Sequence, residues 1–384
     1  MKSGARMRVL VTAGAEKQSL AAVRSLGRAG HLVEVLDPKP DAPAFRSRYC
    51  TARHLSPSNL DRDAYLEFLL TRARAETYTT ILACDDLSAT YLSEERAAFA
   101  PYVRLALPPR DSFLRATDKS EIVALAAELG LPVPSTLRPG SGREAEAMAG
   151  ELGYPVIVKG HHGWGAQHVR LVRDARQLAT SFAEVARLEA ALGAGPPMLQ
   201  EYVHGVGYGF STLFRHGEPR AAFQHRRTAE YDVLVGGKPY SCPMAVSVHD
   251  PDLEQQALRL FAALGWHGLG MAEWRRQNGT GRYFLMEVNP RLVGSTDLAM
   301  RSGVDLPLLA CQMVRDGDVA PVLQHRVGVR MRWLLPDALR DLLARPARLF
   351  DLDTWRSATD WSWRDLAPHV MQLRLAAWTL RHPH

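Results

Sequence analysis

The sequence predicts an α/β fold, and three observations support this prediction. Short apolar segments alternate with amphipathic segments along most of the chain. The 384 residues exceed the size at which one hydrophobic core keeps growing, so two or three packed subdomains are expected. The composition, 46% hydrophobic and 23% charged, is typical of a packed enzyme and excludes a disordered or fibrous chain.

The composition also limits the location and the partners that we expect. No segment reaches the about 20 uninterrupted apolar residues of a membrane helix, and residues 1–8 lack the apolar core of a signal peptide. We therefore expect a soluble, cytoplasmic protein with no membrane partner. The four cysteines are scattered without metal-ligand spacing, which disfavours disulfides and a zinc site. The net charge is +6, but acids are interspersed among the arginines, so no nucleic-acid partner is expected.

The first part of the chain has the alternating pattern of a parallel sheet covered by helices. The expected strands are 8–12, 31–36 and 80–84, and the expected helices are 19–29 and 65–75. The turn after the first strand, residues 12–17, lacks the spaced glycines of a dinucleotide site, so no NAD site is expected. Asp85 and Asp86 follow the third strand, and we interpret them as a helix cap.

The middle of the chain contains a linker and further strands. Asp118 has the position of an N-cap for a helix that ends at Gly130, and a Pro/Gly-rich linker covers 132–142. A helix to Leu152 follows. The remaining expected elements are strands at 155–159, 169–172, 198–203 and 208–214, a helix after Asp174 and a helix at 250–265. Beyond about residue 320, the Trp- and Arg-rich sequence indicates helices packed on the body, with membrane-surface binding as a minor alternative.

A β-hairpin at 269–289 carries the strongest functional signal. Its turn is the Asn- and Gly-rich segment 278–281. Side-chain alternation places Glu287 on the same face as Leu285. If the turn is a three-residue loop, Glu273 and Glu287 lie directly opposite each other, where two like charges are destabilising unless something neutralises them.

A divalent cation would neutralise this pair of glutamates. Hard oxygen donors from Glu273, Glu287 and Asn289 suit Mg²⁺, for which Mn²⁺ could substitute. The alternative is a solvent-facing pair of acids that Arg275 and Arg291 balance. The hairpin by itself leaves both interpretations open.

Two lysines stand out because only six of the 47 basic residues are lysines. Lys159 ends an apolar strand, where a charge is costly unless it meets an anion, and the glycine-punctuated segment 160–165 could cover phosphates. Lys119 follows the predicted N-cap Asp118. The segment 200–203, with the sequence QEYV, would then be a strand that edges an adenine ring.

In this order, the motifs resemble those of the ATP-grasp superfamily, and the resemblance runs from about residue 8 to about residue 320. Its most specific part is Glu273 followed by the sequence EVNPR at 287–291. Segment 224–237 looks like the substrate segment of relatives of the carbamoyl phosphate synthetase large chain and D-aspartate ligase. The resemblance implies ATP and Mg²⁺ as cofactors.

The resemblance also implies roles for individual residues. The residues expected to contact ATP are Lys119, Lys159, Gly163, Gly165, Gln200, Glu201, Tyr202 and Val203. The residues expected to hold Mg²⁺ are Glu273, Glu287 and Asn289. The residues expected to contact the substrates are Arg226, Arg227, Arg291, Gly294 and Ser295, and of these Arg227 and Arg291 are the catalytic candidates.

The implied architecture is an α/β ATP-grasp fold with five segments. These are a Rossmann-like pre-ATP-grasp domain at 1–115, linker helices at 116–153, a small ATP-grasp lobe at 154–205, a large lobe with the metal and substrate site at 206–322, and a small helical C-terminal extension at 323–384. The expected partners are a small-molecule carboxylate and an amine, with a homodimer as one option.

Two departures from the family pattern affect the nucleotide site. The glycine loop contains the bulky residues His161, His162 and Trp164, so its closure over phosphate can differ from that of the small-residue loops of the family. The simplest expectation for the two histidines is that they face solvent. The stretch 204–208 lacks the acid that would hold the ribose.

The function implied is an ATP-dependent, ADP-forming carboxylate–amine ligase that passes through an acyl phosphate and makes an amide or peptide bond. An amino acid is the expected carboxylate. No residue stands out as the general base, and Asp297 and His225 are only positional candidates. The main alternative is a carboxylase or kinase that uses bicarbonate or another carboxylate without an amine acceptor; biotin-type carboxylation is disfavoured because no partner domains are recognised. A silent nucleotide binder is disfavoured because all three metal-ligand candidates are present.

Overall fold

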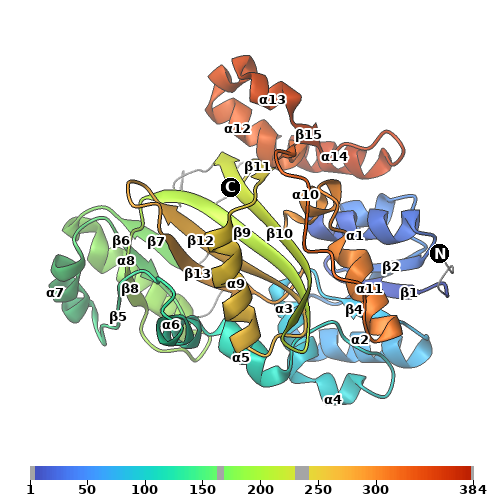
Figure 1. Ribbon diagram of the computed structural model, residues 1–384, viewed down its shortest axis with the longest axis horizontal. Helices are drawn as coiled ribbons and strands as arrows, with labels where there is room; N and C mark the ends of the chain where they lie inside the picture. Colours follow the sequence, from blue (N-terminus) through green and yellow to red (C-terminus); the bar gives the residue numbers. More distant parts are fainter. Residues whose placement is uncertain (1–4, 162–167, 230–241, 382–384) are drawn as a thin grey trace.

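Three sheets with flanking helices form the body of the protein (Figure 1). The computed structural model describes residues 5–161, 168–229 and 242–381. The predicted α/β class is confirmed, and so are most of the predicted elements, whose bounds follow below. The predicted domain boundaries stay a prediction.

The first sheet is parallel and lies near the N-terminus. Its strands are, in spatial order, β3 (Ala52–Leu55), β2 (Leu32–Asp37), β1 (Arg8–Val11) and β4 (Thr80–Leu82). The accompanying helices are α1 (Lys17–Arg28), η1 (Pro43–Arg46), α2 (Arg62–Ala75), α3 (Asp86–Glu94) and α4 (Arg96–Phe99). Because all four strands are parallel, their carboxyl ends lie at one edge, where open α/β sheets place ligands.

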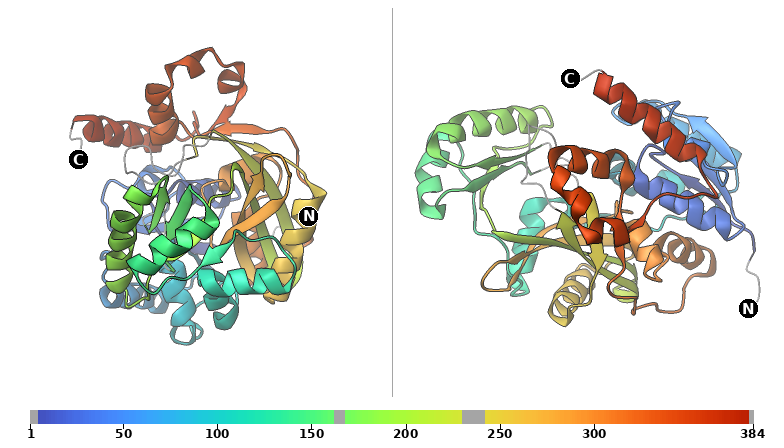
Figure 2. Two further views of the ribbon diagram at one scale, coloured as in Figure 1. Left: turned by 90° about the vertical axis from the view of Figure 1, so that its left-hand side faces the viewer. Right: turned by 90° about the horizontal axis from the view of Figure 1, so that it is seen from above.

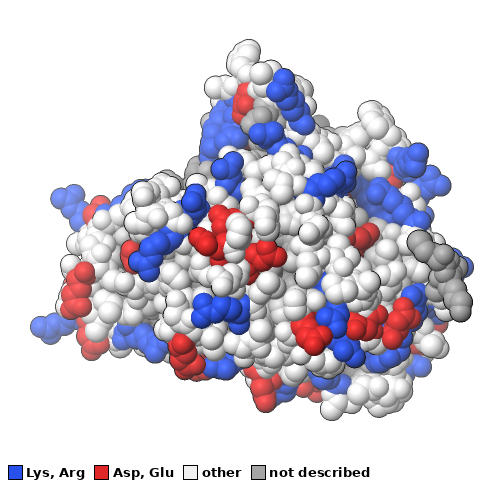
Figure 3. All heavy atoms as spheres, viewed as in Figure 1, with Lys and Arg blue, Asp and Glu red and all other residues white. Residues whose placement is uncertain are grey.

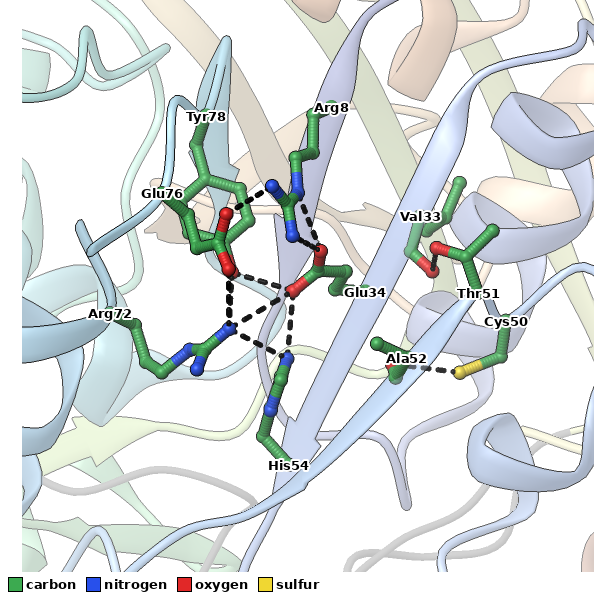
Figure 4. Close-up of polar contacts among 10 residues, drawn as sticks. All are labelled: Arg8, Val33, Glu34, Cys50, Thr51, Ala52, His54, Arg72, Glu76 and Tyr78. Atoms are coloured by element: carbon green, nitrogen blue, oxygen red, sulfur yellow. Dashed lines mark hydrogen bonds and ion pairs between the residues drawn. The ribbon is translucent and has the colours of Figure 1, made fainter. Parts of the chain in front are cut away.

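A buried ion cluster supports the middle of this sheet (Figure 4). The carboxylate of Glu34 on β2 accepts hydrogen bonds from Arg8 at 2.6 Å and from Tyr78 at 2.6 Å, and it contacts His54 at 2.7 Å. Burial by itself would raise the pKa of Glu34, but the hydrogen bonds from Tyr78, His54 and Arg8 outweigh burial and lower that pKa. The Glu34 cluster therefore stabilises the fold above the ordinary pKa of a glutamate, and this stabilisation is lost as pH falls through the lowered pKa.

The second sheet is smaller and is covered by two helices (Figure 2). Its strands are, in spatial order, β5 (Thr136–Leu137), β8 (Met198–Glu201), β6 (Val156–Lys159) and β7 (Val169–Val172). Its helices are α7 (Gly142–Leu152) and α8 (Ala175–Ala190), and α5 (Arg110–Thr117) and α6 (Lys119–Glu128) precede it in the chain. The predicted N-caps are confirmed: Asp118 accepts from Ser120 and Glu121, and Asp174 accepts from Arg176 and Gln177.

The third sheet is central and mostly antiparallel. Its strands are, in spatial order, β13 (Tyr283–Asn289), β12 (Gly268–Gln277), β9 (Gly205–Arg215), β10 (Glu218–Ala229), β11 (Met244–Ser247), β14 (Arg330–Arg332) and β15 (Ala358–Thr359). Its helices are α9 (Pro251–Ala263), α10 (Thr296–Arg301) and α11 (Leu306–Asp316). One face packs on the apolar cluster that includes Phe214, Phe261 and Trp274, and the other packs toward the first sheet through Leu213 and Phe223.

The C-terminal extension is not purely helical, which corrects the prediction. Strands β14 and β15 add two short strands to the edge of the central sheet before and between the helices. The helical elements of the extension are η2 (Leu334–Ala338), α12 (Leu339–Ala344), η3 (Pro346–Phe350), α13 (Leu352–Arg356) and α14 (Ala367–Arg381). Two- and three-residue strands show no alternation, so the sequence did not reveal them.

A buried ion pair fixes the C-terminal extension to the first sheet and its helices. Helix α14 lies beside these helices (Figure 2). Arg24 of α1 donates from Nε to the Asp365 carboxylate at 2.8 Å, and its Nη2 lies 3.0 Å from His369 Nε2. The side chains of Arg24 and Asp365 are 7% and 1% exposed. The predicted packing of the tail on the body is therefore confirmed.

The surface charges are mixed. Figure 3 shows acidic and basic side chains interspersed over one face, with basic side chains also on the projecting C-terminal extension. In the part of the chain that the structure describes, no helix has the length and apolar character needed to cross a bilayer.

Candidate active site

The β12–β13 hairpin brings the two predicted metal-binding glutamates together. Glu273 pairs directly with Glu287, as predicted. The hairpin reaches this register differently from the expectation: the turn has four residues between the hydrogen-bonded Gln277 and Arg282, and a bulge next to Met286 shifts the pairing by one residue.

The bulge also corrects the predicted face of Leu285. Leu285 pairs with Trp274 and belongs to the apolar cluster beneath the sheet, whereas Glu287 pairs with Glu273 on the other face. Of the two arginines in the alternative interpretation, Arg275 donates from its guanidinium to the carbonyl oxygen of Val203 at 2.7 Å, whereas the charge of Arg291 acts on both glutamates.

Arg227 on β10 is the cation that contacts the first glutamate. Its Nη2 donates to Glu273 Oε2 at 2.7 Å. Burial, and then the charge of Glu287, raise the pKa of Glu273 against the opposing effect of Arg227. Arg226 is exposed and lies on the opposite face of the strand, so only one of the two predicted arginines is brought to the glutamate pair.

Both predicted lysines lie next to the second glutamate. Lys119 and Lys159 are 9% and 6% exposed, and Lys159 Nζ donates to the carbonyl oxygen of Met286 at 3.1 Å. Burial would raise the pKa of Glu287, but the charges of Lys159 and Lys119 outweigh burial and lower it. Burial and the charge of Lys119 lower the pKa of Lys159 to about 8.

Asn289 and Arg291 complete the hairpin motif. Asn289 Nδ2 lies 3.4 Å from Glu287 Oε1, and Arg291 Nη2 lies 3.4 Å from Asn289 Oδ1. Arg291 is further held by Asp86, to which it donates from Nε at 2.6 Å and from Nη2 at 2.7 Å. Arg291 thus links the central sheet to the N-terminal unit.

Asp86 is the residue that sequence reasoning missed. The cap interpretation is confirmed for Asp85, which accepts from the backbone of Ser88, but Asp86 instead forms a two-point ion pair with Arg291. The available signal was the position of Asp86 at the carboxyl end of β4, where ligands bind in α/β sheets. Its partner could not be identified because the two residues are 205 positions apart.

The predicted adenine-contacting hinge, segment 200–203, begins within β8, an inner strand of the second sheet, and continues beyond its end. Gln200 is 2% exposed, and its Nε2 donates to Thr136 Oγ1 at 3.1 Å, while Gln200 Oε1 is buried without a hydrogen-bond partner. The backbone of Glu201 donates to the carbonyl oxygen of Ser135 at 2.8 Å.

Two main-chain groups of this hinge are therefore already bonded within the protein. Besides the N–H of Glu201, the carbonyl oxygen of Val203 accepts from Arg275. Tyr202 packs against the ring of His204, with 4.7 Å between centroids. Adenine recognition by these residues stays a prediction, and the groups left for it are those not used in these contacts.

Four predicted positions lie elsewhere or outside the described residues. Gly163 and Gly165 fall within 162–167, outside the part that the structure describes. Gly294 is covered by Lys17, because a Cβ there would come 2.4 Å from Lys17 Cε. Ser295 is 8% exposed and precedes α10.

The expectation that His161 faces solvent is wrong. Its ring is half-buried, with Nε2 2.9 Å from the carbonyl oxygen of Pro196 and Nδ1 3.2 Å from Ser120 Oγ. His162 lies outside the described residues.

Neither positional candidate for a general base is supported. Burial lowers the pKa of His225 to about 3, so this residue is neutral and a weak base. Asp297 lies 3.5 Å from Arg301 on its own helix.

The chemistry of the hairpin fits a divalent cation. Glu273 and Glu287 face each other and Asn289 adds an amide oxygen, which is the oxygen-rich donor set that Mg²⁺ takes. Within the described residues no third Asp, Glu, His or Cys joins them, so the rest of a Mg²⁺ shell would consist of water and phosphate oxygens. The hairpin, with the buried Lys119 and Lys159 beside it, therefore has the chemistry of a candidate site for a divalent cation and phosphate groups.

Two family models match the chain. One describes an ATP-grasp in the biosynthetic pathway with Ter operon and matches residues 195–335. The other describes the ATP-binding domain of the carbamoyl-phosphate synthase L chain and matches residues 118–206. No curated protein sequence matches the chain significantly.

Solved structures share the fold at low sequence identity. Biotin carboxylase from Campylobacter jejuni in complex with β,γ-ATP superposes with a TM-score of 0.69 at 17% identity, covering 85% of this chain and 74% of that one. N5-carboxyaminoimidazole synthetase from Staphylococcus aureus has a TM-score of 0.65 at 15% identity, covering 90% and 86%. The biotin carboxylase domain dimer of Hydrogenobacter thermophilus 2-oxoglutarate carboxylase, in complex with MgADP, ADP and bicarbonate, has a TM-score of 0.69 at 15% identity, covering 85% and 74%.

The two models, which together match residues 118–335, and the shared fold support the resemblance of this chain to ATP-grasp ligases. The models support an ATP-dependent ligase, and MgADP is bound in one of the structural neighbours.

Proposed function

We propose that this chain is an ATP-dependent carboxylate–amine ligase that activates a carboxylate, in the first instance that of an amino acid, as an acyl phosphate with release of ADP. The observation that carries the proposal is the contact of 2.7 Å between Arg227 and Glu273. It puts a guanidinium, which matches a carboxylate in shape and charge, beside the candidate metal ligands. A substrate carboxylate bound there would meet the phosphates of ATP.

The remaining site residues receive roles that suit this reaction. Glu273, Glu287 and Asn289 would hold Mg²⁺, which when bound neutralises charge on the phosphates. Lys119 and Lys159 would bind phosphate oxygens, and the hinge at 200–203 would contact the adenine. Arg291, kept in one orientation by Asp86, would bind the transferred phosphoryl group or the acyl phosphate.

The reaction has two steps. A carboxylate oxygen of the substrate forms a bond to the γ-phosphorus while the bond from that phosphorus to the β,γ-bridging oxygen breaks, which releases ADP. The amine then attacks the acyl carbon, loses a proton and displaces phosphate. Arg227 and Arg291 would stabilise the negative charge on the acyl oxygen.

Hydroxylamine trapping tests the proposal. The protein is incubated with Mg²⁺, ATP, pooled amino acids and hydroxylamine, and the nucleotides and hydroxamates are identified by mass spectrometry. ADP together with a hydroxamate supports an acyl phosphate and names the carboxylate. AMP with pyrophosphate would contradict the mechanism.

A carboxylase or kinase is the second candidate, and the named structural neighbours favour it. Two of them are biotin carboxylases and the third is a carboxyaminoimidazole synthetase. ADP formation that depends on bicarbonate, with no requirement for an amine, would support this candidate over the ligase.

A homodimer is part of the proposal. One of the neighbours is described as a domain dimer. Light scattering at several protein concentrations would test whether this chain dimerises.

A further inference from the structure

A second cluster of polar groups lies at the root of the loop that follows Lys159, away from the hairpin. Its centre is Glu189, near the end of α8, which is completely buried. The Glu189 carboxylate accepts a hydrogen bond from the backbone N–H of His161 at 2.8 Å and contacts Nδ1 of His168. One buried carboxylate therefore joins the residue that begins this loop to the residue that ends it.

Gly160 belongs to the same cluster. A Cβ at this position would come 2.2 Å from Glu189 Oε1 and 3.0 Å from His168 Cβ, so only glycine allows the carboxylate to approach. The N–H of Gly160 donates to the carbonyl oxygen of His168 at 2.8 Å, which extends the β6–β7 pairing by one step beyond Lys159. The glycine after Lys159 is thus required for packing against Glu189.

The ring of His161 connects this cluster to helix α6. Because the Pro196 carbonyl oxygen can only accept, His161 Nε2 donates to it at 2.9 Å. His161 Nδ1 is hydrogen-bonded to the hydroxyl of Ser120, 3.2 Å away. Ser120 directly follows Lys119, so the hydrogen bonds run from the root of the loop after Lys159 to the start of the helix that carries Lys119.

The two lysines need such a connection. They come from different elements, α6 and β6, and both are buried next to the glutamate hairpin. Like charges repel, so the spacing between two ammonium groups is fixed only if the backbone segments that carry them are fixed. A spacing that matches the oxygens of a polyphosphate strengthens binding because less order is lost when the ligand binds.

We propose that His161 is a positioning residue that, together with Glu189, sets the position of Lys119 relative to Lys159 and so determines the affinity for the phosphates of ATP. This inference rests on the proposed nucleotide site. It assigns a role to a bulky residue at a loop position where the family pattern has small ones.

The substitution His161→Ala tests the proposal because it removes both ring hydrogen bonds and keeps the backbone N–H that Glu189 binds. We expect the dissociation constant of MgATP, measured by calorimetry, to rise about fivefold. The KM for ATP should rise by a similar factor, whereas kcat and the KM for the carboxylate should change less than about twofold. His161→Asn, which retains a polar atom near the Nδ1 position, should recover part of the affinity.

Two further variants make the test specific. Ser120→Ala removes the same hydrogen bond from the other partner and should weaken MgATP binding in the same direction. His249→Ala removes a half-exposed histidine that lies 3.5 Å from Glu254 and should leave the affinity unchanged.

A double-mutant cycle with Lys119→Met separates positioning from a general loss of structure. If His161 acts through Lys119, His161→Ala should have little further effect in the Lys119→Met background. Unchanged affinity in the single variant, or effects that simply multiply in the double variant, would overturn the proposal. If the wild-type protein itself fails to bind MgATP, the proposed nucleotide site fails and this inference fails with it.

Discussion

At the scale of single residues, the two facing glutamates differ in their electrostatic surroundings. Burial raises the pKa of Glu273 even though Arg227 contacts its carboxylate. The charges of Lys159 and Lys119 lower the pKa of Glu287. Glu287 is therefore the better anion of the pair. A cation that binds between them would keep both ionised.

The substitution Glu287→Gln should abolish ATP turnover without unfolding the protein. It removes the stronger metal ligand and also one of two like charges, so the loss of ADP formation should be about a hundredfold or more while the melting temperature is kept. Steady-state ADP release and thermal unfolding measure the two effects. Glu254→Gln, outside the hairpin, is the matched control, and wild-type activity in Glu287→Gln would rule out the metal assignment.

Lys159 predicts how nucleotide binding depends on pH. Burial and the nearby Lys119 lower its pKa to about 8, and only the protonated amine attracts phosphate. The affinity for MgATP should therefore fall about tenfold between about pH 7 and about pH 9, as the amine loses its proton. Calorimetry at several pH values measures this. Lys159→Arg keeps its charge and should show a flat profile; a flat profile in the wild type would contradict the assignment.

The ion pair between Asp86 and Arg291 predicts an effect on kcat that is separate from the binding of the metal and the nucleotide. Asp86→Asn replaces a two-point ion pair with a weaker contact and lets the guanidinium rotate. We expect kcat to fall about tenfold or more, with little change in the affinity for MgATP. Asp86→Glu is the conservative comparison, and equal losses of nucleotide affinity and kcat would count against this positioning role.

At the scale of elements, the hairpin illustrates what a sequence reveals and what it hides. Its strands, its turn region and the facing glutamates followed from alternation and from the Asn- and Gly-rich turn. The bulge next to Met286 could not be predicted, because an extra residue in one strand leaves no trace in composition. The ion pair between Arg291 and Asp86 could not be predicted either, because it depends on how the central sheet packs against the first sheet.

Strand β9, which pairs with β12 in the central sheet, has its own requirement for glycine. Gly209 pairs with both Glu273 and His225, and a Cβ there would come 2.2 Å from His225 Cε1. Gly209→Ala should therefore lower the free energy of unfolding by about 1–3 kcal/mol through overpacking. Urea denaturation measures this loss. Gly150→Ala, in helix α7 where a Cβ meets nothing within 4 Å, should be neutral or stabilising, and the same result at Gly209 would contradict the packing account.

At the scale of the whole molecule, two basic side chains of α1 are among the groups that join the C-terminal extension to the N-terminal part of the chain. Arg24 reaches Asp365, and Lys17 lies 3.0 Å from Asp337 and 4.6 Å from the centroid of the Trp333 ring. The composition of the tail predicted that it packs on the body, but not which residues it contacts. Contacts between segments more than 300 residues apart in the chain have no local signature.

Arg24→Ala should release the extension. It would remove the guanidinium from the buried Asp365 carboxylate, which would keep its hydrogen bonds from the Ser47 hydroxyl and the Arg48 N–H, and this costs up to about 3–5 kcal/mol. Hydrogen exchange should then increase in α14 first, and limited proteolysis should cut within the extension. Arg28→Ala, on the same helix, is the control, and unchanged exchange in α14 would show that Arg24 does not hold it.

The central claim concerns the complete reaction, and the co-substrate dependence of ADP formation tests it most directly. In buffer freed of carbon dioxide, ADP is measured with MgATP and a carboxylate identified by hydroxylamine trapping, with and without an amine and with and without bicarbonate. A carboxylate–amine ligase predicts that sustained ADP release requires the carboxylate and the amine and yields a stoichiometric amide. Sustained ADP release that requires bicarbonate and no amine would contradict the account and identify a carboxylase.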